Sequence, residues 1–143
     1  MTFISRKIAA LIVSSVVITP VFADGHSAGD PTKGKKVFKK CASCHDVSEK
    51  EKIKVGPPLL NIVGRKIASF EGYKYSSGFT ALGAKDEAWT EEMLMKYLKN
   101  PKKYVRKQLD DKKAKTKMVL KLKKDKDRAN VIAYLKSLSK PAE

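Results

Sequence analysis

The feature that most constrains this chain is a pair of cysteines separated by two residues, with a histidine directly after the second: Cys41-Ala42-Ser43-Cys44-His45. These are the only two cysteines of the sequence. Thiols at this spacing lie on one turn and can both add to the vinyl groups of one porphyrin, while the imidazole lies beneath the ring and can bind its iron. The motif therefore predicts one covalently attached haem.

Three other interpretations of the motif were weighed. A thioredoxin-like redox pair needs a βαβ setting, whereas the flanking segments are lysine-rich and indicate helix. A zinc site needs about four ligands, and only His26 is available beyond the motif. A structural disulfide beside a chance histidine is the third. The complete five-residue pattern favours haem over all three.

The first 23 residues have the pattern of a secretory signal. Arg6 and Lys7 precede an apolar stretch over residues 8–18, and Val21-Phe22-Ala23 place small or aliphatic residues before Asp24. The apolar stretch is too short for a membrane anchor, which needs about 20 residues. We expect cleavage after Ala23, a single haem-binding domain over residues 24–143, a periplasmic location and no stable membrane insertion.

The chain is strongly basic, with 31 Lys and Arg against 15 Asp and Glu and a formal net charge of +16. Cleavage of the signal removes only two of the basic residues. Such an excess implies an anionic partner. An exported protein rarely meets nucleic acid, and no zinc-finger or RNA-binding motif is present. We therefore expect an acidic protein surface as the partner, no nucleic acid, and a monomer.

The hydrophobic pattern predicts an all-α fold of three to five short helices joined by long loops. Asp30-Pro31 starts a helix that runs to Lys40, with Val37 and Phe38 facing inward. Thr90 caps a second helix, which Asn100-Pro101 ends. Loops this long are unusual in a compact domain unless they surround a cofactor.

The remaining segments give weaker signals. Asp125 is predicted to cap the last helix, whose apolar positions are Val131, Leu135 and Leu138. Residues 67–83, rich in Gly, Ser and Tyr, are predicted to form loop and turns. Residues 102–117 are mostly charged and show no strong pattern.

A haem iron bound by one histidine has a sixth position to fill. The candidates are His26, Met93, Met95 and Met118. Met93 and Met95 flank Leu94 on a predicted helix, where packing or partial exposure is the favoured interpretation. Met118 lies on an interhelical segment that can cross the opposite haem face. Chemistry alone favours Met118 as a ligand, with packing in the core as the alternative.

The order and spacing of several motifs resemble class I c-type cytochromes, of the bacterial cytochrome c2 kind close to mitochondrial cytochrome c. The resemblance covers about residues 29–138. Its anchors are Cys41–His45, Gly56-Pro57-Pro58-Leu59, Gly64-Arg65-Lys66, Gly72-Tyr73-Lys74-Tyr75, Trp89, residues 94–104, Thr116-Lys117-Met118 and residues 131–135. Residues 106–115 lack the short Pro-Gly turn of mitochondrial chains, which favours the longer bacterial subgroup.

The resemblance implies roles for individual residues. Cys41 and Cys44 carry the thioether bonds of one haem c, and His45 and Met118 are the axial ligands of its iron. The Pro57 carbonyl accepts a hydrogen bond from His45. Arg65, Tyr75 and Trp89 hold a haem propionate. Tyr97 and Thr116 lie on the methionine side and tune the iron. Gly34 and Phe38 pack on the last helix near Val131 and Tyr134.

By the same resemblance the protein is no enzyme but a soluble periplasmic one-electron carrier. It passes electrons from a cytochrome bc1-type complex to a terminal oxidase or photosynthetic reaction centre. A lysine ring docks on acidic faces of these partners: Lys39, Lys40, Lys54, Lys102, Lys115, Lys117, Lys123 and Lys124. The alternatives are a haem enzyme or gas sensor with a labile sixth position, and a polyanion-binding protein with a structural haem.

Overall fold

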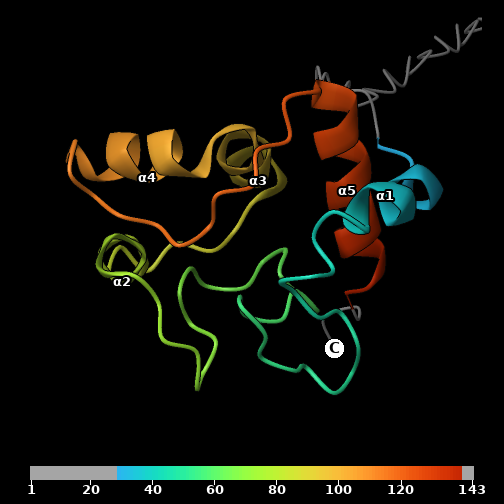
Figure 1. Ribbon diagram of the computed structural model, residues 1–143, viewed down its shortest axis with the longest axis horizontal. Helices are drawn as coiled ribbons and strands as arrows, with labels where there is room; N and C mark the ends of the chain where they lie inside the picture. Colours follow the sequence, from blue (N-terminus) through green and yellow to red (C-terminus); the bar gives the residue numbers. More distant parts are fainter. Residues whose placement is uncertain (1–28, 140–143) are drawn as a thin grey trace, which may run out of the picture.

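The computed structural model describes residues 29–139, and within them five helices are joined by long irregular segments (Figure 1). The helices are α1 Pro31–Phe38, α2 Ser77–Gly83, α3 Glu91–Lys99, α4 Pro101–Leu109 and α5 Asp125–Ser137. The described residues form no strand, only an isolated antiparallel bridge between Lys66 and Ala88. The predicted all-α class is confirmed. The predicted signal segment, residues 1–23, lies outside the described residues.

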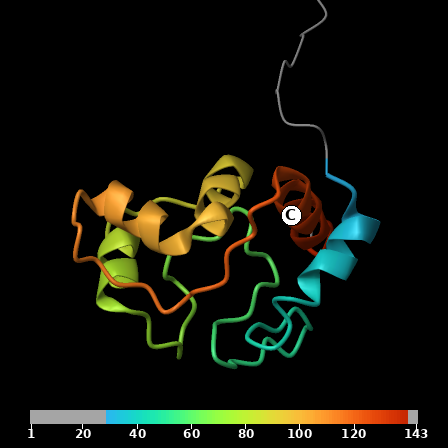
Figure 2. The same cartoon turned by 45° about the horizontal axis from the view of Figure 1, so that its top comes forward.

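Helices α1 and α5 cross in close contact on one side of the molecule, α2 and α4 lie on the other, and α3 lies between them in contact with both α5 and α4 (Figures 1 and 2). At the crossing, a Cβ on Gly34 would lie 1.9 Å from the Asn130 carbonyl oxygen and 2.7 Å from Cβ of Tyr134. The Phe38 and Tyr134 rings pack with centroids 5.5 Å apart. The expected contact of Gly34 and Phe38 with the last helix is thus present.

The capping signals at two helix starts are confirmed. The Asp30 carboxylate accepts a hydrogen bond from the Lys33 amide at 3.0 Å, and the Thr90 hydroxyl accepts one from the Met93 amide at 3.1 Å. Each satisfies an amide that has no partner within its own helix. In α1, Phe38 is buried and Val37 half-buried.

Helix α4 corrects the prediction for residues 102–117. Asn100 does end α3, but its side chain also accepts a hydrogen bond from the Lys103 amide at 3.1 Å, and Pro101 opens the next helix. The same two residues thus stop one helix and start another. The exposed side of α4 is charged, and its buried side is short, with the adjacent pair Tyr104 and Val105.

Helix α2 corrects the loop predicted for residues 67–83. Its sequence, Ser-Gly-Phe-Thr-Ala-Leu-Gly, has no side-chain cap hydrogen bond and weak helix propensity. Packing stabilises it instead, because Leu82 is buried and Gly78 lies against α4 and the segment that follows α4. The predicted cap of the last helix also needs a correction. Asp125 is the first residue of α5 and Lys124 holds the cap position, while the Asp125 carboxylate pairs with Arg128.

Gly34→Ala should destabilise the haem-loaded protein by about 3 kcal/mol, because the added methyl overlaps the α5 backbone and forces the helices apart. Urea unfolding followed by helical circular dichroism measures the change. Lys36→Ala, at an exposed position of the same helix, is the control and should change stability by less than about 0.5 kcal/mol. Equal stabilities for the two variants would contradict the close crossing.

Candidate haem-binding site

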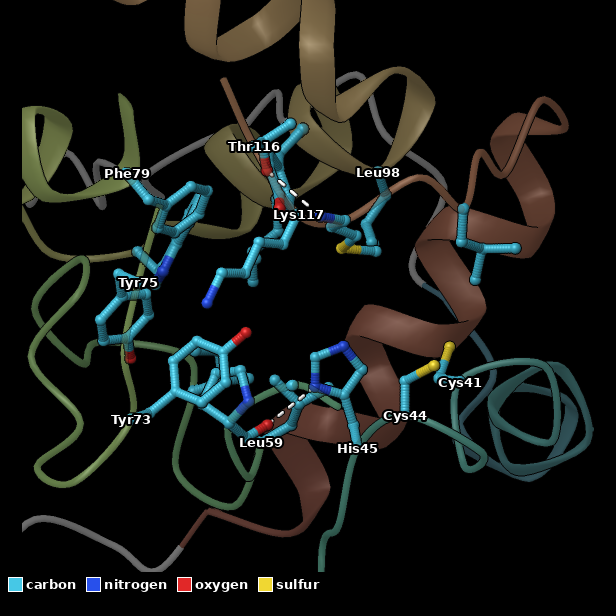
Figure 3. Close-up of a pocket in the computed structure, with 18 of the residues that line it drawn as sticks. Cys41, Cys44, His45, Leu59, Tyr73, Tyr75, Phe79, Leu98, Thr116 and Lys117 are labelled. Atoms are coloured by element: carbon cyan, nitrogen blue, oxygen red, sulfur yellow. Dashed lines mark hydrogen bonds between the residues drawn. The ribbon is translucent and has the colours of Figure 1, made fainter. Parts of the chain in front are cut away.

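The cysteine motif forms a tight turn directly after α1. The Cys44 and His45 amides both donate to the Cys41 carbonyl, at 3.0 and 2.9 Å. Figure 3 shows both sulfurs at one end of a cavity, on the same side as the His45 ring. Both thiols are free, and burial raises the pKa of Cys41. The turn therefore presents two thiols together to one edge of the cavity.

The His45 imidazole is held by its contact with residues 56–57. Its Nδ1 lies 2.7 Å from the Pro57 carbonyl oxygen, so Nδ1 carries the proton and donates it. Burial lowers the pKa of His45, and the Pro57 hydrogen bond partly opposes that shift. The ring is therefore neutral at neutral pH, and its unprotonated Nε2 points into the cavity (Figure 3). A neutral imidazole with a fixed tautomer is suited to binding iron.

The opposite wall comes from the segment that follows α4. Thr116 and Lys117 lie across the cavity from His45, beside Leu98 of α3 (Figure 3), and Met118 lines the same cavity. Arg106 Nε donates to the Ala114 carbonyl at 3.3 Å, and the Ser76 hydroxyl donates to the Lys115 carbonyl at 2.9 Å. These two bonds fix the segment to α4 and to the start of α2.

Tyr97 and Thr116 meet on this methionine side. Tyr97 is buried, and its burial raises the pKa of the phenol far above its ordinary value, although a hydrogen bond with the Thr116 side chain opposes the shift. The Thr116 hydroxyl also lies 3.4 Å from the Met118 amide. A hydroxyl network thus surrounds the backbone of Met118, and Tyr97 stays protonated across the usual pH range.

Arg65, Tyr75 and Trp89 come together from three loops. Arg65 donates to the Pro58 carbonyl at 2.7 Å and to the Leu60 carbonyl at 3.3 Å, and its burial lowers the pKa of the guanidinium. The Tyr75 oxygen accepts a bond from the Phe70 amide, which leaves its hydroxyl proton available for another acceptor. A half-buried cation that lines the same cavity as a phenol and an indole is suited to binding a carboxylate.

All ten residues predicted from the sequence line this one cavity: Cys41, Cys44, His45, Pro57, Arg65, Tyr75, Trp89, Tyr97, Thr116 and Met118. Met93 and Met95 do not line it, and His26 lies outside the described residues. Most other lining residues are apolar, among them Leu59, Leu94, Leu98, Val131 and Leu135. Two thiols at one end, a neutral imidazole, an apolar interior and a half-buried arginine fit the thioethers, iron, macrocycle and propionate of a haem c.

Two aromatic residues of the cavity were missed as site residues. Tyr73 and Phe79 line the side opposite the cysteines, where Phe79 stacks on Tyr75 with centroids 5.9 Å apart (Figure 3). Tyr73 belongs to the Gly72–Tyr75 motif, so its proximity to Tyr75 offered a signal. Phe79 offered none, because its position depends on α2, which the sequence did not predict.

The predicted lysine ring is distributed unevenly around the cavity. Only Lys40 and Lys117 of the eight line it, together with Lys66, which was not predicted. Lys117 runs across the cavity toward Tyr73, with Nζ 5.2 Å from the ring centroid, and donates to the Lys74 carbonyl (Figure 3). Lys54 donates to the Ala42 carbonyl at 2.9 Å, which ties the cysteine turn to residues 54–57.

Comparison with known proteins agrees with this geometry. The sequence profile of the family described as Cytochrome c matches residues 31–139. Cytochrome c2 of Pararhodospirillum photometricum is 47% identical over 112 residues, which cover 78% of this chain and 99% of that protein. The chain belongs to the cytochrome c family. Cytochrome c2 of Rhodobacter capsulatus is 40% identical over 138 residues, covering 92% of this chain and 96% of that protein.

Solved structures give the same result. Cytochrome c2 from Rhodospirillum centenum superposes with a TM-score of 0.75 at 40% sequence identity, covering 78% of this chain and 100% of that one. Cytochrome c2 from Paracoccus denitrificans superposes with a TM-score of 0.70 at 41% sequence identity, covering 77% of this chain and 96% of that one. Members of this cytochrome c family carry a covalent haem c and transfer electrons. The protein is therefore an electron carrier and not an enzyme.

Gly56→Ala should displace the His45 ring, because the new Cβ would lie 2.4 Å from Cε1 and 2.7 Å from Nδ1. We expect a loss of about 1–3 kcal/mol in unfolding free energy and a shift or loss of the Nδ1–H proton resonance. Gly72→Ala is the control, since it adds backbone strain at φ +76° but no contact with His45. An unchanged Nδ1–H resonance in Gly56→Ala would contradict the predicted displacement.

Proposed function

We propose that this protein is a soluble periplasmic one-electron carrier of the cytochrome c2 type. It takes electrons from a cytochrome bc1-type complex and delivers them to a terminal oxidase or a photosynthetic reaction centre. Residues 1–23 act as its cleaved signal, and residues 24–143 form a single haem-binding domain. The observation that carries the proposal is the convergence of all ten predicted site residues on one cavity.

The chain's residues divide the work of holding the cofactor. When bound, haem c supplies an iron that cycles between the ferric and ferrous states. Cys41 and Cys44 would hold it covalently, and His45 and Met118 would be the two protein ligands of its iron. Pro57 fixes the His45 tautomer and raises its donor strength. Methionine sulfur favours the reduced metal, so this ligand pair favours electron transfer over binding of an external substrate.

The surrounding residues control charge and polarity. Arg65, Tyr75 and Trp89 would hold a haem propionate, because a carboxylate in an apolar interior needs a cation and hydrogen-bond donors. Tyr97 and Thr116 order the methionine side through their mutual hydrogen bond. Because these groups are fixed before the electron arrives, little rearrangement accompanies the change of charge.

The strong excess of lysine and arginine, with Lys40, Lys66 and Lys117 at the cavity, supports docking on acidic partners. No helix of the described residues is long and apolar enough to cross a membrane. The excess of lysine speeds encounter with an acidic surface and keeps the complex short-lived, because exposed pairs are weak and screened by salt. The ring proposed for docking comprises Lys39, Lys40, Lys54, Lys102, Lys115, Lys117, Lys123 and Lys124.

Met118→Ala should abolish the weak far-red charge-transfer band of ferric haem bound by methionine, and the ferrous variant should bind carbon monoxide readily. Absorption spectra of the haem-loaded protein in both oxidation states give both results. Met95→Ala is the control, since Met95 is half-buried on α3 and does not line the cavity. A native protein without the band, or a Met118→Ala variant that keeps it, would refute the proposed ligation.

Lys40→Gln should slow electron exchange with a purified bc1-type complex several-fold at low ionic strength, with the difference shrinking above about 0.1 M salt. Stopped-flow absorbance at a series of salt concentrations measures this rate. Lys136→Gln is a matched control, because each variant removes one charge and one surface ion pair, with Asp127 or Glu91, but Lys136 does not line the cavity. Equal slowing in both variants would contradict docking at the cavity mouth.

A further inference from the structure

A second hollow lies on the far side of the methionine segment, between α4 and residues 113–121. Figures 1 and 2 show that segment returning alongside α4 after the helix ends. Pro101 and Ala114 are buried residues of its lining, and Thr116 and Met118 line both this hollow and the haem cavity. Whatever binds here therefore contacts the segment that carries the proposed iron ligand.

The charge of this hollow is entirely positive. No acidic residue lines it. The five cations that do are Lys102, Arg106, Lys113, Lys115 and Lys121. None of the five takes part in an ion pair among residues 29–139, whereas five other lysines of that range do. The nearest carboxylate in sequence, that of Asp111, accepts the Lys113 amide and does not line the hollow. An anion would relieve the mutual repulsion of these cations.

Arg106 differs from the four lysines because a hydrogen bond to the backbone orients its side chain. Its Nε donates to the Ala114 carbonyl at 3.3 Å, and the guanidinium is partly buried between α4 and the returning segment. One bond of the planar group is thus used for orientation, while its terminal N–H groups are not hydrogen-bonded within the described residues. A planar fork held in this way is suited to a tetrahedral oxyanion, which it can bind through two parallel bonds.

The lining also limits the class of anion. It contains no aromatic side chain on which a base could stack, so a nucleotide or nucleic acid gains nothing over its phosphate groups. The apolar contribution is restricted to Pro101, Ala114, Met118 and the exposed Val119. We propose that this hollow is a binding site for a small polyvalent oxyanion of the phosphate or pyrophosphate class, which bridges α4 to residues 113–121.

Binding at this site should reach beyond the site itself. An anion that bridges α4 and residues 113–121 binds only when they are together, and so stabilises the arrangement that presents Met118. Lys102 and Lys115 also belong to the proposed docking ring, so the bound anion should weaken docking. That last consequence rests on the proposed function, whereas anion binding does not.

The test is a titration of the ¹⁵N-labelled, haem-loaded ferrous protein with inorganic phosphate and with pyrophosphate, at constant ionic strength set by sodium chloride. Two-dimensional amide spectra should shift at residues 101–106 and 113–121 and saturate. Arg106→Gln should weaken pyrophosphate binding at least tenfold, and Arg106→Lys should restore only part of it because the fork is lost. Lys107→Gln, at an exposed position of α4 outside the hollow, should stay within twofold.

A second variant and a second anion keep the result decisive. Lys121→Gln removes a lining charge without touching the Arg106–Ala114 bond and should weaken pyrophosphate binding several-fold. Retention of the far-red band in the ferric form of this variant verifies that Met118 is undisturbed. Shifts spread over the whole lysine surface, or equal weakening by Lys107→Gln and Arg106→Gln, would overturn the site in favour of a diffuse ionic atmosphere. Citrate binding as tightly as pyrophosphate would overturn the oxyanion class and point to acidic side chains of a protein partner.

Discussion

The close crossing of α1 and α5 at Gly34 is the contact on which the rest of the site depends. Without a side chain at Gly34, the α1 backbone approaches the Asn130 carbonyl, and Phe38 packs against Tyr134. The end of α1 then leads directly into the turn that carries Cys41 and Cys44. Since α5 also contributes Val131 and Leu135 to the cavity, one helix pair both places the thiols and forms part of the apolar wall.

Besides backbone hydrogen bonds between loops, bonds from charged side chains to backbone carbonyls hold the long loops in place. Arg65 holds residues 58–60, Lys54 holds the cysteine turn, Arg106 holds Ala114, and Arg128 holds the Leu122 carbonyl at 2.6 Å. Within residues 29–139, each of these cations donates to a carbonyl for which no backbone hydrogen bond between loops is found. The basic composition therefore serves the fold as well as the surface.

Where the signals were local, the sequence allowed correct prediction of the fold class and of two helix starts, and it named residues that the structure brings together. Asp30 and Thr90 cap the helices expected of them, and the ten proposed site residues do converge on one cavity. Prediction failed where stability comes from tertiary packing. Helix α2 has no side-chain cap hydrogen bond and forms because Leu82 and Gly78 are covered by other segments, and Phe79 enters the cavity only as a result. Helix α4 was missed because Asn100-Pro101 was taken only as a stop.

The sequence by itself determined which chemical groups this protein offers: two thiols and an imidazole on one turn, a methionine as the proposed second ligand, and a strong excess of basic residues. Spacing within a few residues is enough for this, since a short peptide has few ways to arrange neighbouring side chains. Only the tertiary structure decided which lysines reach the cavity, that Lys117 turns toward Tyr73, and that Arg106 faces a second, wholly cationic hollow. Those relations join residues far apart in the chain, and they exist only once the helices have packed.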